Sequence, residues 1–318
     1  MSPLVFIVGC ARSGTTLLQR IVDAHPQIAV TPELHWVTHY FRDRKKFLSP
    51  VGRVTPEQVE SMIENTKRFS QLEFTPEEFR GLLPGGEPAP YVTFLNGIFE
   101  LYRKHSGKPL VGNKTPAYVR RLPLFHQIWP GAKFVHIIRD GRDVCLSVLN
   151  WYHADRTAGR YSTWAEDPVS TTALWWERKV RLGQQGGESL PPDLYYEISY
   201  ESLVHQPAEE CAKLCAFLGV PYEEKMLRFH EGRTRNKPGL DAKKAWLPIT
   251  PGLRDWRTQM PPADQERFEA VAGDLLDELG YPRAFPRPSA EVAERAARFR
   301  ASFTEEMLRE EEELPQSW

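Results

Sequence analysis

Cysteines and metal-binding patterns are scarce in this chain of 318 residues. Its four cysteines form neither a C-x-x-C pair nor a regularly spaced framework, which argues against a disulfide scaffold and favours reduced thiols. Cys211 and Cys215 are four residues apart, but no second pair or suitably spaced histidines accompany them as metal ligands. We therefore predict that the protein uses no metal.

Excess charge and long apolar runs are lacking as well. The net charge is −1, from 41 Lys and Arg against 42 Asp and Glu, so nucleic acid or an anionic membrane would feel no bulk attraction. No apolar run has the length of about 20 residues that a membrane span needs, and the chain opens directly into a predicted strand without a leader pattern. We expect a cytoplasmic protein without a membrane span or a nucleic-acid partner, which binds anions only through local clusters of cations.

The most informative stretch is residues 9–16, which follow an apolar strand predicted at 4–8 and precede a helix predicted at 17–24. Gly9 and Gly14 allow positive φ and a close approach of the backbone to a ligand. The free N–H groups at the start of the helix then point at whatever lies above them, and the partial positive charge there favours an anion. This stretch predicts a phosphate site.

The spacing of these residues is that of a P-loop, with one departure. Thr15 stands where a nucleoside triphosphatase has the lysine that reaches the β- and γ-phosphates, and Thr16 follows it. Arg12 supplies a cation from within the loop instead. The pattern therefore argues against ATP or GTP chemistry, although it keeps the phosphate cradle.

Two charged residues are predicted at strand ends on the same side of the sheet. Glu33 follows a strand predicted at 28–30, and Lys114 ends a strand predicted at 110–114. Glu33 is either a general base for an attacking hydroxyl group or a carboxylate that favours a helix N-terminus. Lys114 is either a second cation of the anion site or an ordinary surface lysine.

A second dense motif lies at residues 133–143, where a β-branched strand ends in Arg139 and Asp140 and a glycine turns the chain into a helix that carries Ser147. An aspartate at such a strand end resembles the magnesium-binding strand of P-loop nucleotidases. The flanking Arg139 and Arg142 make the site cationic, which favours a second phosphate over a metal. Two anion sites imply a ligand with two phosphate groups.

Strands that alternate with helices predict an α/β fold, with a P-loop and a mostly parallel sheet of about five strands flanked by helices on both faces. We predict one catalytic domain at residues 1–285, with a helical insertion at 40–105 that is a candidate acceptor-binding region. An aromatic loop at 151–164 either lines an acceptor pocket or belongs to the core. The extension at 286–318 carries a helix with one apolar stripe, as a docked arm or a homodimer contact.

Three motifs resemble those of one family. Residues 11–16 with 23–26 are similar to its 5′-phosphosulfate loop, 134–147 to its 3′-phosphate motif, and 199–203 to its Tyr-Glu-x-Leu segment. The family is that of the sulfotransferases that use 3′-phosphoadenosine 5′-phosphosulfate (PAPS), in the bacterial and tyrosylprotein-type branch. The resemblance covers residues 4–282.

By position, the resemblance implies roles for individual residues. Arg12 and the amides of Ser13, Gly14, Thr15 and Thr16 would hold the 5′-phosphosulfate, with Lys114 at the bridging oxygen. Glu33 would be the catalytic base, Arg139 and Ser147 would hold the 3′-phosphate, and Tyr200 would close around the adenosine end. Arg254 is our choice for the last 3′-phosphate ligand, with Lys243 or Lys244 as alternatives.

The function implied is transfer of a sulfuryl group from PAPS to a small or conjugated hydroxyl acceptor, with release of 3′,5′-ADP. Carbohydrates, phenols, lipids and peptidyl tyrosine stay open as acceptors. Two other functions remain as alternatives, a P-loop phosphotransferase similar to nucleotide kinases and a non-catalytic nucleotide-binding protein.

Overall fold

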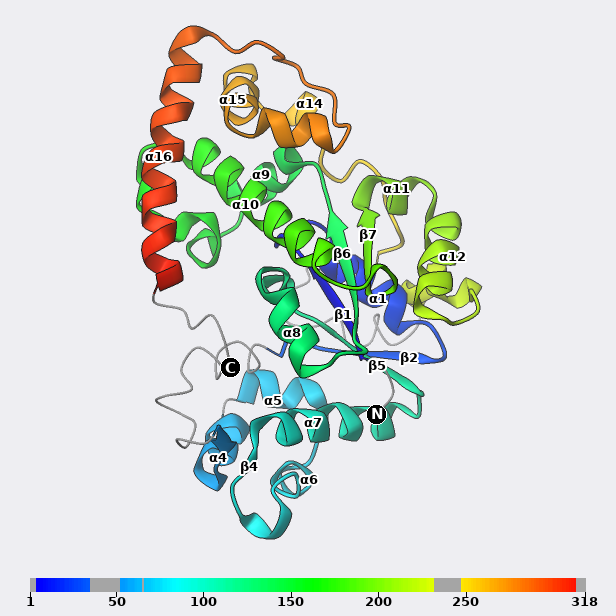
Figure 1. The fold of residues 1–318 in the computed structure, drawn as a ribbon. Helices are drawn as coiled ribbons and strands as arrows, with labels where there is room; N and C mark the ends of the chain where they lie inside the picture. Colours follow the sequence, from blue (N-terminus) through cyan, green and yellow to red (C-terminus); the bar gives the residue numbers. More distant parts are fainter. Residues whose placement is uncertain (1–3, 35–51, 65, 232–246, 313–318) are drawn as a thin grey trace.

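A parallel sheet forms the centre of the protein. The computed structural model describes residues 4–34, 52–64, 66–231 and 247–312, and its main sheet has five strands in the order β2-β5-β1-β6-β7, each parallel to its neighbour (Figure 1). The strands are β1 (Leu4–Gly9), β2 (Ile28–Thr31), β5 (Leu110–Lys114), β6 (Lys133–Ile138) and β7 (Tyr195–Ser199). The predicted fold class is confirmed.

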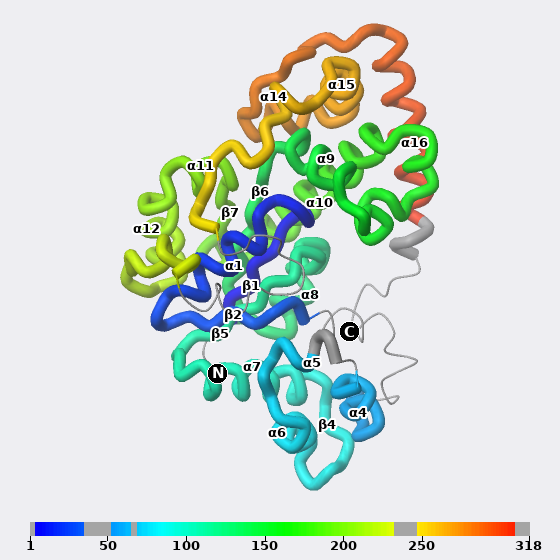
Figure 2. The backbone as a smooth tube through the Cα atoms, turned by 180° about the vertical axis from the view of Figure 1, so that it is seen from behind, coloured from blue at the N-terminus to red at the C-terminus, as the bar shows by residue number. Residues whose placement is uncertain are grey.

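Both faces of the sheet are covered because the central strand is apolar throughout. Phe6 and Val8 of β1 pack into one cluster, whereas Val5 and Ile7 pack into another on the opposite face. Figure 1 shows α8 in front of the sheet, and Figure 2, seen from behind, shows α1 on the other side. The covering helices are α7 (Tyr91–Ser106) and α8 (Leu122–Ile128) on the first face, and α1 (Thr15–Asp23), α11 (Tyr200–His205) and α12 (Pro207–Leu218) on the second.

A third apolar cluster joins five further helices beyond the end of β6. These are α9 (Gly141–Leu149), α10 (Pro168–Glu188), α14 (Trp256–Gln259), α15 (Pro262–Glu278) and α16 (Ala290–Glu312). The predicted stripe of α16 is buried in this cluster through Ala296, Phe299, Phe303 and Met307. The stripe therefore docks on the chain itself.

The predicted insertion is helical where it is described, and it lies at one end of the molecule (Figure 1). Its elements are β3 (Arg53–Val54), α4 (Pro56–Glu64), α5 (Thr66–Leu72), α6 (Pro76–Arg80), η1 (Pro84–Gly86) and β4 (Ala89–Pro90). The other short turns are the 3₁₀ helices η2 (Pro116–Arg121), η3 (Ala154–Arg156), η4 (Ala158–Arg160), η5 (Ser162–Ala165), η6 (Pro192–Leu194) and η7 (Glu224–Glu231). Of the helices in the described ranges, none combines the length and apolarity required to cross a bilayer.

Two element boundaries differ from a simple interpretation of the sequence. Residues 117–129 suggest one helix, but the structure divides them into η2 and α8, because Pro123 lies in the first turn of α8 and favours a new helix start there. Trp175 and Trp176 suggest the opening of a helix, whereas α10 begins at Pro168. The side chain of Asp167 accepts hydrogen bonds from the amides of the first turn of α10 and so sets its start.

The strand order determines where a ligand can bind. β1 lies between β5 and β6. After β1 the chain forms β2 and β5 on one side of this strand, and then β6 and β7 on the other side. In open α/β sheets, the carboxyl ends of the strands at such a switch point form a crevice for ligands. The residues that follow β1, β2, β5 and β6 all lie at this edge, which we call the sheet edge.

Candidate functional site

The loop after β1 has a backbone that only glycine permits at two positions. Gly9 has φ of 153°, and a Cβ atom there would lie 2.6 Å from the carbonyl oxygen of Ile137 on β6. Gly14 has φ of 93° and is the N-cap of α1. Because glycine has no side chain to cap the helix, the first amides of α1 stay available to an anion.

Arg12 joins this loop to α9. Its φ is 74°, a left-handed conformation that a non-glycine residue seldom adopts. From there its Nε donates to the Oγ of Ser147 at 3.0 Å, and its guanidinium lies 4.9 Å from the ring centre of Trp151. The strained backbone therefore brings a cation to the point where the loop, α9 and the segment after α9 meet.

Glu33 and Lys114 form an ion pair at the sheet edge. The side chain of Lys114 is 6% exposed and that of Glu33 is 29% exposed. The Nζ of Lys114 also lies 3.4 Å from the Oγ1 of Thr16 in the first turn of α1. An ammonium group has three N–H donors, so Lys114 contacts the carboxylate and the phosphate loop at the same time. This burial and these contacts do not fit the alternative of an ordinary surface lysine.

Arg139 directly follows β6 and has a donor that no described residue satisfies. The residue is 5% exposed, its Nη2 donates to Asp143 at 3.1 Å, and its guanidinium lies 4.2 Å from the ring centre of Tyr200. Its buried Nε has no hydrogen-bond partner in the described part of the chain. An unsatisfied buried donor on a cation is costly unless a ligand accepts from it, which favours an anion at this position.

Arg254 approaches Arg139 from a segment that runs beside α11 towards α14 (Figure 2). Burial and the positive charge of Arg139 both lower the pKa of Arg254. Asp143 holds this segment, because its Oδ1 accepts from the backbone N–H of Trp256 at 2.9 Å while its Oδ2 accepts from Arg139. Because the positive charge of Arg139 acts on Arg254 in this way, an anion between the two would be favourable. The alternatives Lys243 and Lys244 lie outside the described residues.

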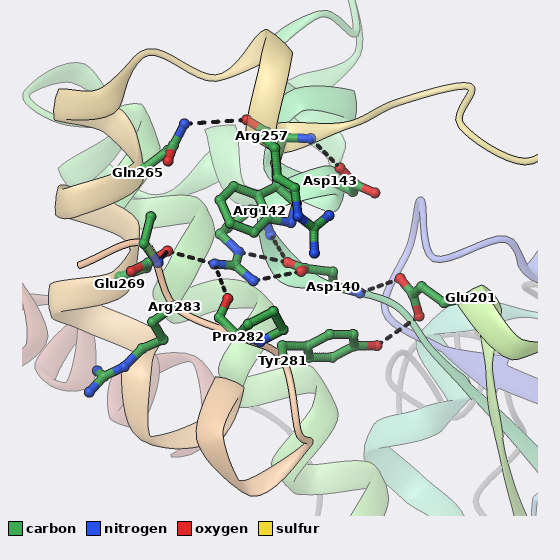
Figure 3. A network of polar contacts seen from close by, with 12 residues as sticks. Asp140, Arg142, Asp143, Glu201, Arg257, Gln265, Glu269, Tyr281, Pro282 and Arg283 are labelled. Carbon is green, nitrogen blue, oxygen red and sulfur yellow. Dashed lines mark hydrogen bonds and ion pairs between the residues drawn. The ribbon is translucent and has the colours of Figure 1, made fainter. Parts of the chain in front are cut away.

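Arg142 does not belong to this anion site, contrary to the prediction from the sequence. It is fully buried, and its Nε and Nη2 donate to Asp140 while its Nη1 donates to Glu269 and to the carbonyl of Pro282 (Figure 3). Its guanidinium also stacks 3.5 Å from the ring centre of Trp256. Because two carboxylates neutralise its charge, Arg142 anchors α15 and α14 to the start of α9.

Tyr200 lies between the two anion sites. A Cβ atom at Gly14 would lie 2.4 Å from the ring of Tyr200, so this ring packs directly on the phosphate loop, while its face contacts Arg139. Its neighbour Glu201 has a structural role, since it accepts from the N–H of Asp140 at 3.0 Å and from the hydroxyl group of Tyr281 at 2.8 Å.

Two residues of the site were not predicted as such. Asp143 links Arg139 to the segment of Arg254, and its position four residues after Arg139 is the sequence signal for that pair. Trp151 contacts Arg12, but the sequence offered only a group of aromatic residues in a loop. Among the described residues, no group of three or more His, Cys, Asp or Glu side chains is arranged to hold a metal.

Comparisons with known proteins agree with this geometry. A model described as "Sulfotransferase family" matches residues 3–224. The chain is 23% identical to a protein-tyrosine sulfotransferase of Drosophila melanogaster over 94% of its own length and 57% of that protein, so it spans little more than half of this relative. It is 26% identical to protein-tyrosine sulfotransferase 1 of Danio rerio, over 94% of its own length and 79% of that protein.

Solved structures show the same fold. The sulfotransferase domain from the Synechococcus PCC 7002 olefin synthase has a TM-score of 0.61 at 23% identity, over 88% of this chain and 95% of that one. The sulfotransferase domain from the curacin biosynthetic pathway has a TM-score of 0.57 at 18% identity, over 89% of this chain and 99% of that one.

Proposed function

The chain belongs to the sulfotransferase family, and we propose that it transfers a sulfuryl group from PAPS to the hydroxyl group of an acceptor and releases 3′,5′-ADP. One observation carries the proposal, namely that two separate anion sites lie at one edge of the sheet. The first is the start of α1 with Lys114, and the second is Arg139 with Arg254. PAPS has two separate anionic groups, so it matches both.

The residues at the sheet edge fit the donor. The amides of Gly14, Thr15 and Thr16 would hold the 5′-phosphosulfate at the start of α1, whereas the amide of Ser13, also predicted for this role, donates to the carbonyl of Cys10 at 3.2 Å. Arg139 would hold the 3′-phosphate through its buried Nε, which has no partner among the described residues, together with Arg254. Ser147 accepts from Arg12 at 3.0 Å, and its own hydroxyl hydrogen remains to donate to a phosphate oxygen. Tyr200 keeps the two groups apart.

The reaction is an in-line displacement at sulfur. Glu33 accepts the proton of the acceptor hydroxyl while that oxygen bonds to sulfur, and the bond between sulfur and the phosphate oxygen breaks. The phosphate oxygen leaves with the electron pair, and Lys114 and Arg12 neutralise the charge that develops on it. Lys114 is suited to this role because it contacts both Glu33 and Thr16.

The phosphotransferase alternative finds less support. A P-loop kinase needs a lysine at the position of Thr15 and an aspartate that helps to hold Mg²⁺ at the end of a neighbouring strand. Asp140 is the aspartate in question, and its carboxylate is engaged by Arg142 and by the backbone N–H of the same residue. Asp140, the residue that suggested a magnesium site, therefore already forms an ion pair with Arg142 in the protein interior.

We further propose that peptidyl tyrosine is the first acceptor to test, because the relatives named above act on protein tyrosine by their names. The acceptor would approach Glu33 between the insertion and the aromatic loop after α9. The cytoplasmic location and a homodimer stay predictions from the sequence.

The test is PAPS turnover, followed as release of 3′,5′-ADP, with a tyrosine-containing peptide, 2-naphthol, an oligosaccharide and a hydroxylated lipid as acceptors. We expect at least one acceptor to be sulfated without added metal. Isothermal titration of 3′,5′-ADP, with ATP and Mg²⁺ as the comparison, separates the alternatives. Tighter binding of ATP, or binding of 3′,5′-ADP without turnover on any acceptor, would contradict the proposal.

A further inference from the structure

The C-terminal helix α16 contacts the segment that leads away from the active site. Residues 151–166 connect α9 to α10 and lie beside α16 (Figure 1). From here on, the name aromatic loop refers to this whole segment, which is two residues longer than the loop predicted at 151–164. Glu306 of α16 accepts hydrogen bonds from the backbone N–H of Ser162 at 3.1 Å and from its Oγ at 2.8 Å. The ring of Phe303 lies 4.6 Å from that of Tyr161, and both residues are buried.

A salt-bridge contact joins the far end of the aromatic loop to the same helix. The Nη2 of Arg295 on α16 lies 3.8 Å from Glu166 and 3.6 Å from Asp167. Asp167 is fully buried and caps the start of α10. The helix therefore contacts the loop near its middle and at its end.

The aromatic loop is a continuous series of hydrogen-bonded turns, because η3, η4 and η5 follow one another with almost no residues between them. Its backbone bonds are Ala154 N to Trp151 O at 3.1 Å, Thr157 N to Ala154 O at 2.8 Å, Tyr161 N to Ala158 O at 3.2 Å and Trp164 N to Tyr161 O at 3.0 Å. These hydrogen-bonded turns connect Tyr161, which contacts α16, to Trp151.

Trp151 is the end of this series that faces the active site. Its ring lies 4.9 Å from the guanidinium of Arg12, the cation of the phosphate loop. The neighbouring Tyr152 is 76% exposed, and its ring lies 3.9 Å from that of His153. The loop thus presents aromatic rings to solvent directly beside the donor site, where an acceptor has to approach.

We infer that α16 is a positioning element for acceptor binding, which holds Trp151 and Tyr152 in place through Glu306 and Phe303. The inference rests on the proposed function, because it assumes that the protein binds an acceptor for the sulfuryl group. The family match ends at residue 224, so α16 lies outside the matched region. Among the interactions described, none joins α16 directly to the donor site, so the binding of 3′,5′-ADP should not respond to variants of α16.

The test compares Glu306→Ala and Phe303→Leu with Arg300→Gln. Arg300 is the matched control, since it also ties α16 to the core, through Glu177 at 2.6 Å and the carbonyl of Val271 at 2.7 Å, but makes no contact with the aromatic loop among the interactions described. We expect the first two variants to raise the KM for 2-naphthol or a tyrosine-containing peptide by about 3- to 10-fold, the size typical of losing one ordinary hydrogen bond. The Kd for 3′,5′-ADP should stay unchanged.

Hydrogen–deuterium exchange of the amides of residues 151–166 supplies a readout that needs no activity. We expect these amides to exchange faster in Glu306→Ala than in the wild type, and at the wild-type rate in Arg300→Gln. Glu306→Gln should restore part of the protection, because its side chain keeps an oxygen that can accept a hydrogen bond. Equal exchange and an equal acceptor KM in all variants would overturn the inference. If the wild-type protein sulfates no acceptor but the exchange difference is present, the proposed function fails while the positioning by α16 stands.

Discussion

Two charged regions lie only a few residues apart along the chain and have opposite characters. At the sheet edge, Arg139 keeps a buried Nε without a partner in the described structure, and Arg254 lies close to it. In the interior, Arg142 donates to two carboxylates and one carbonyl and stacks on Trp256. One region has donors left for a ligand, and the other has used them to hold the fold together.

The difference shows why charge alone does not identify a binding residue. Both arginines are buried, and both follow the same strand in the sequence. What separates them is the set of carboxylates that reaches each one, since Glu269 arrives from α15 and neutralises only Arg142. Loss of a residue at the sheet edge should therefore impair binding or chemistry, whereas loss of a residue in the interior should impair stability.

The largest effect is expected from Glu33→Gln at the sheet edge. The side-chain amide of glutamine cannot take up the proton of the substrate's hydroxyl group. The kcat should therefore fall by about 10²- to 10⁴-fold, the usual contribution of a general base. Rates come from the PAPS turnover assay, and calorimetric titration of 3′,5′-ADP should give an unchanged Kd. A wild-type rate in a variant that binds the nucleotide would remove Glu33 from the mechanism.

Arg142→Met tests the other side of the comparison. It leaves the carboxylates of Asp140 and Glu269 buried without their cation, and such a loss typically costs about 3–5 kcal/mol of unfolding free energy. Urea unfolding followed by tryptophan fluorescence measures it. If the variant were as stable as the wild type but failed to bind 3′,5′-ADP, Arg142 would belong to the binding region after all.

Arg139→Gln should have the reverse pattern. Loss of its charged hydrogen bonds to a phosphate should weaken the binding of 3′,5′-ADP by about 10- to 100-fold, with a smaller loss of stability than in Arg142→Met, because Arg139 pairs with one carboxylate, that of Asp143, which is partly exposed. Arg257→Gln is the matched control, because Arg257 is an exposed arginine close in sequence to Arg254, and its guanidinium lies 4.6 Å from the ring centre of Trp256. Equal Kd values for both variants would place the 3′-phosphate elsewhere.

A pH-dependent effect concerns His136, which is buried in β6, the strand that precedes these two regions. Burial lowers the pKa of His136 from 6.5 to about 3. Between pH 6.5 and pH 3, the imidazole of His136 is therefore protonated in the unfolded chain but neutral in the folded chain. The unfolding free energy should therefore fall as pH falls from 6.5 towards 3. His136→Gln should flatten this slope in urea unfolding at pH 7, 6, 5 and 4; an unchanged slope would contradict the assignment.

Local chemistry made much of the fold and site predictable. Apolar runs followed by glycine and a helix indicated β1 and β6, and their alternation with helices indicated a parallel sheet, because strand and helix patterns depend on neighbouring residues. The same logic placed Glu33, Lys114 and Arg139 at strand ends. Their meeting at one edge follows from parallel strands, which share the direction of their carboxyl ends.

The sequence by itself determined the strands, the phosphate loop and the resemblance to sulfotransferases, since these depend on residues close together in the chain. Only the tertiary structure decided that Arg142 is neutralised by Glu269 on α15, that Asp143 holds the segment of Arg254, and that α16 contacts the aromatic loop. These pairs are more than 100 residues apart, and the packing of separate helices, rather than any local pattern, brings them into contact.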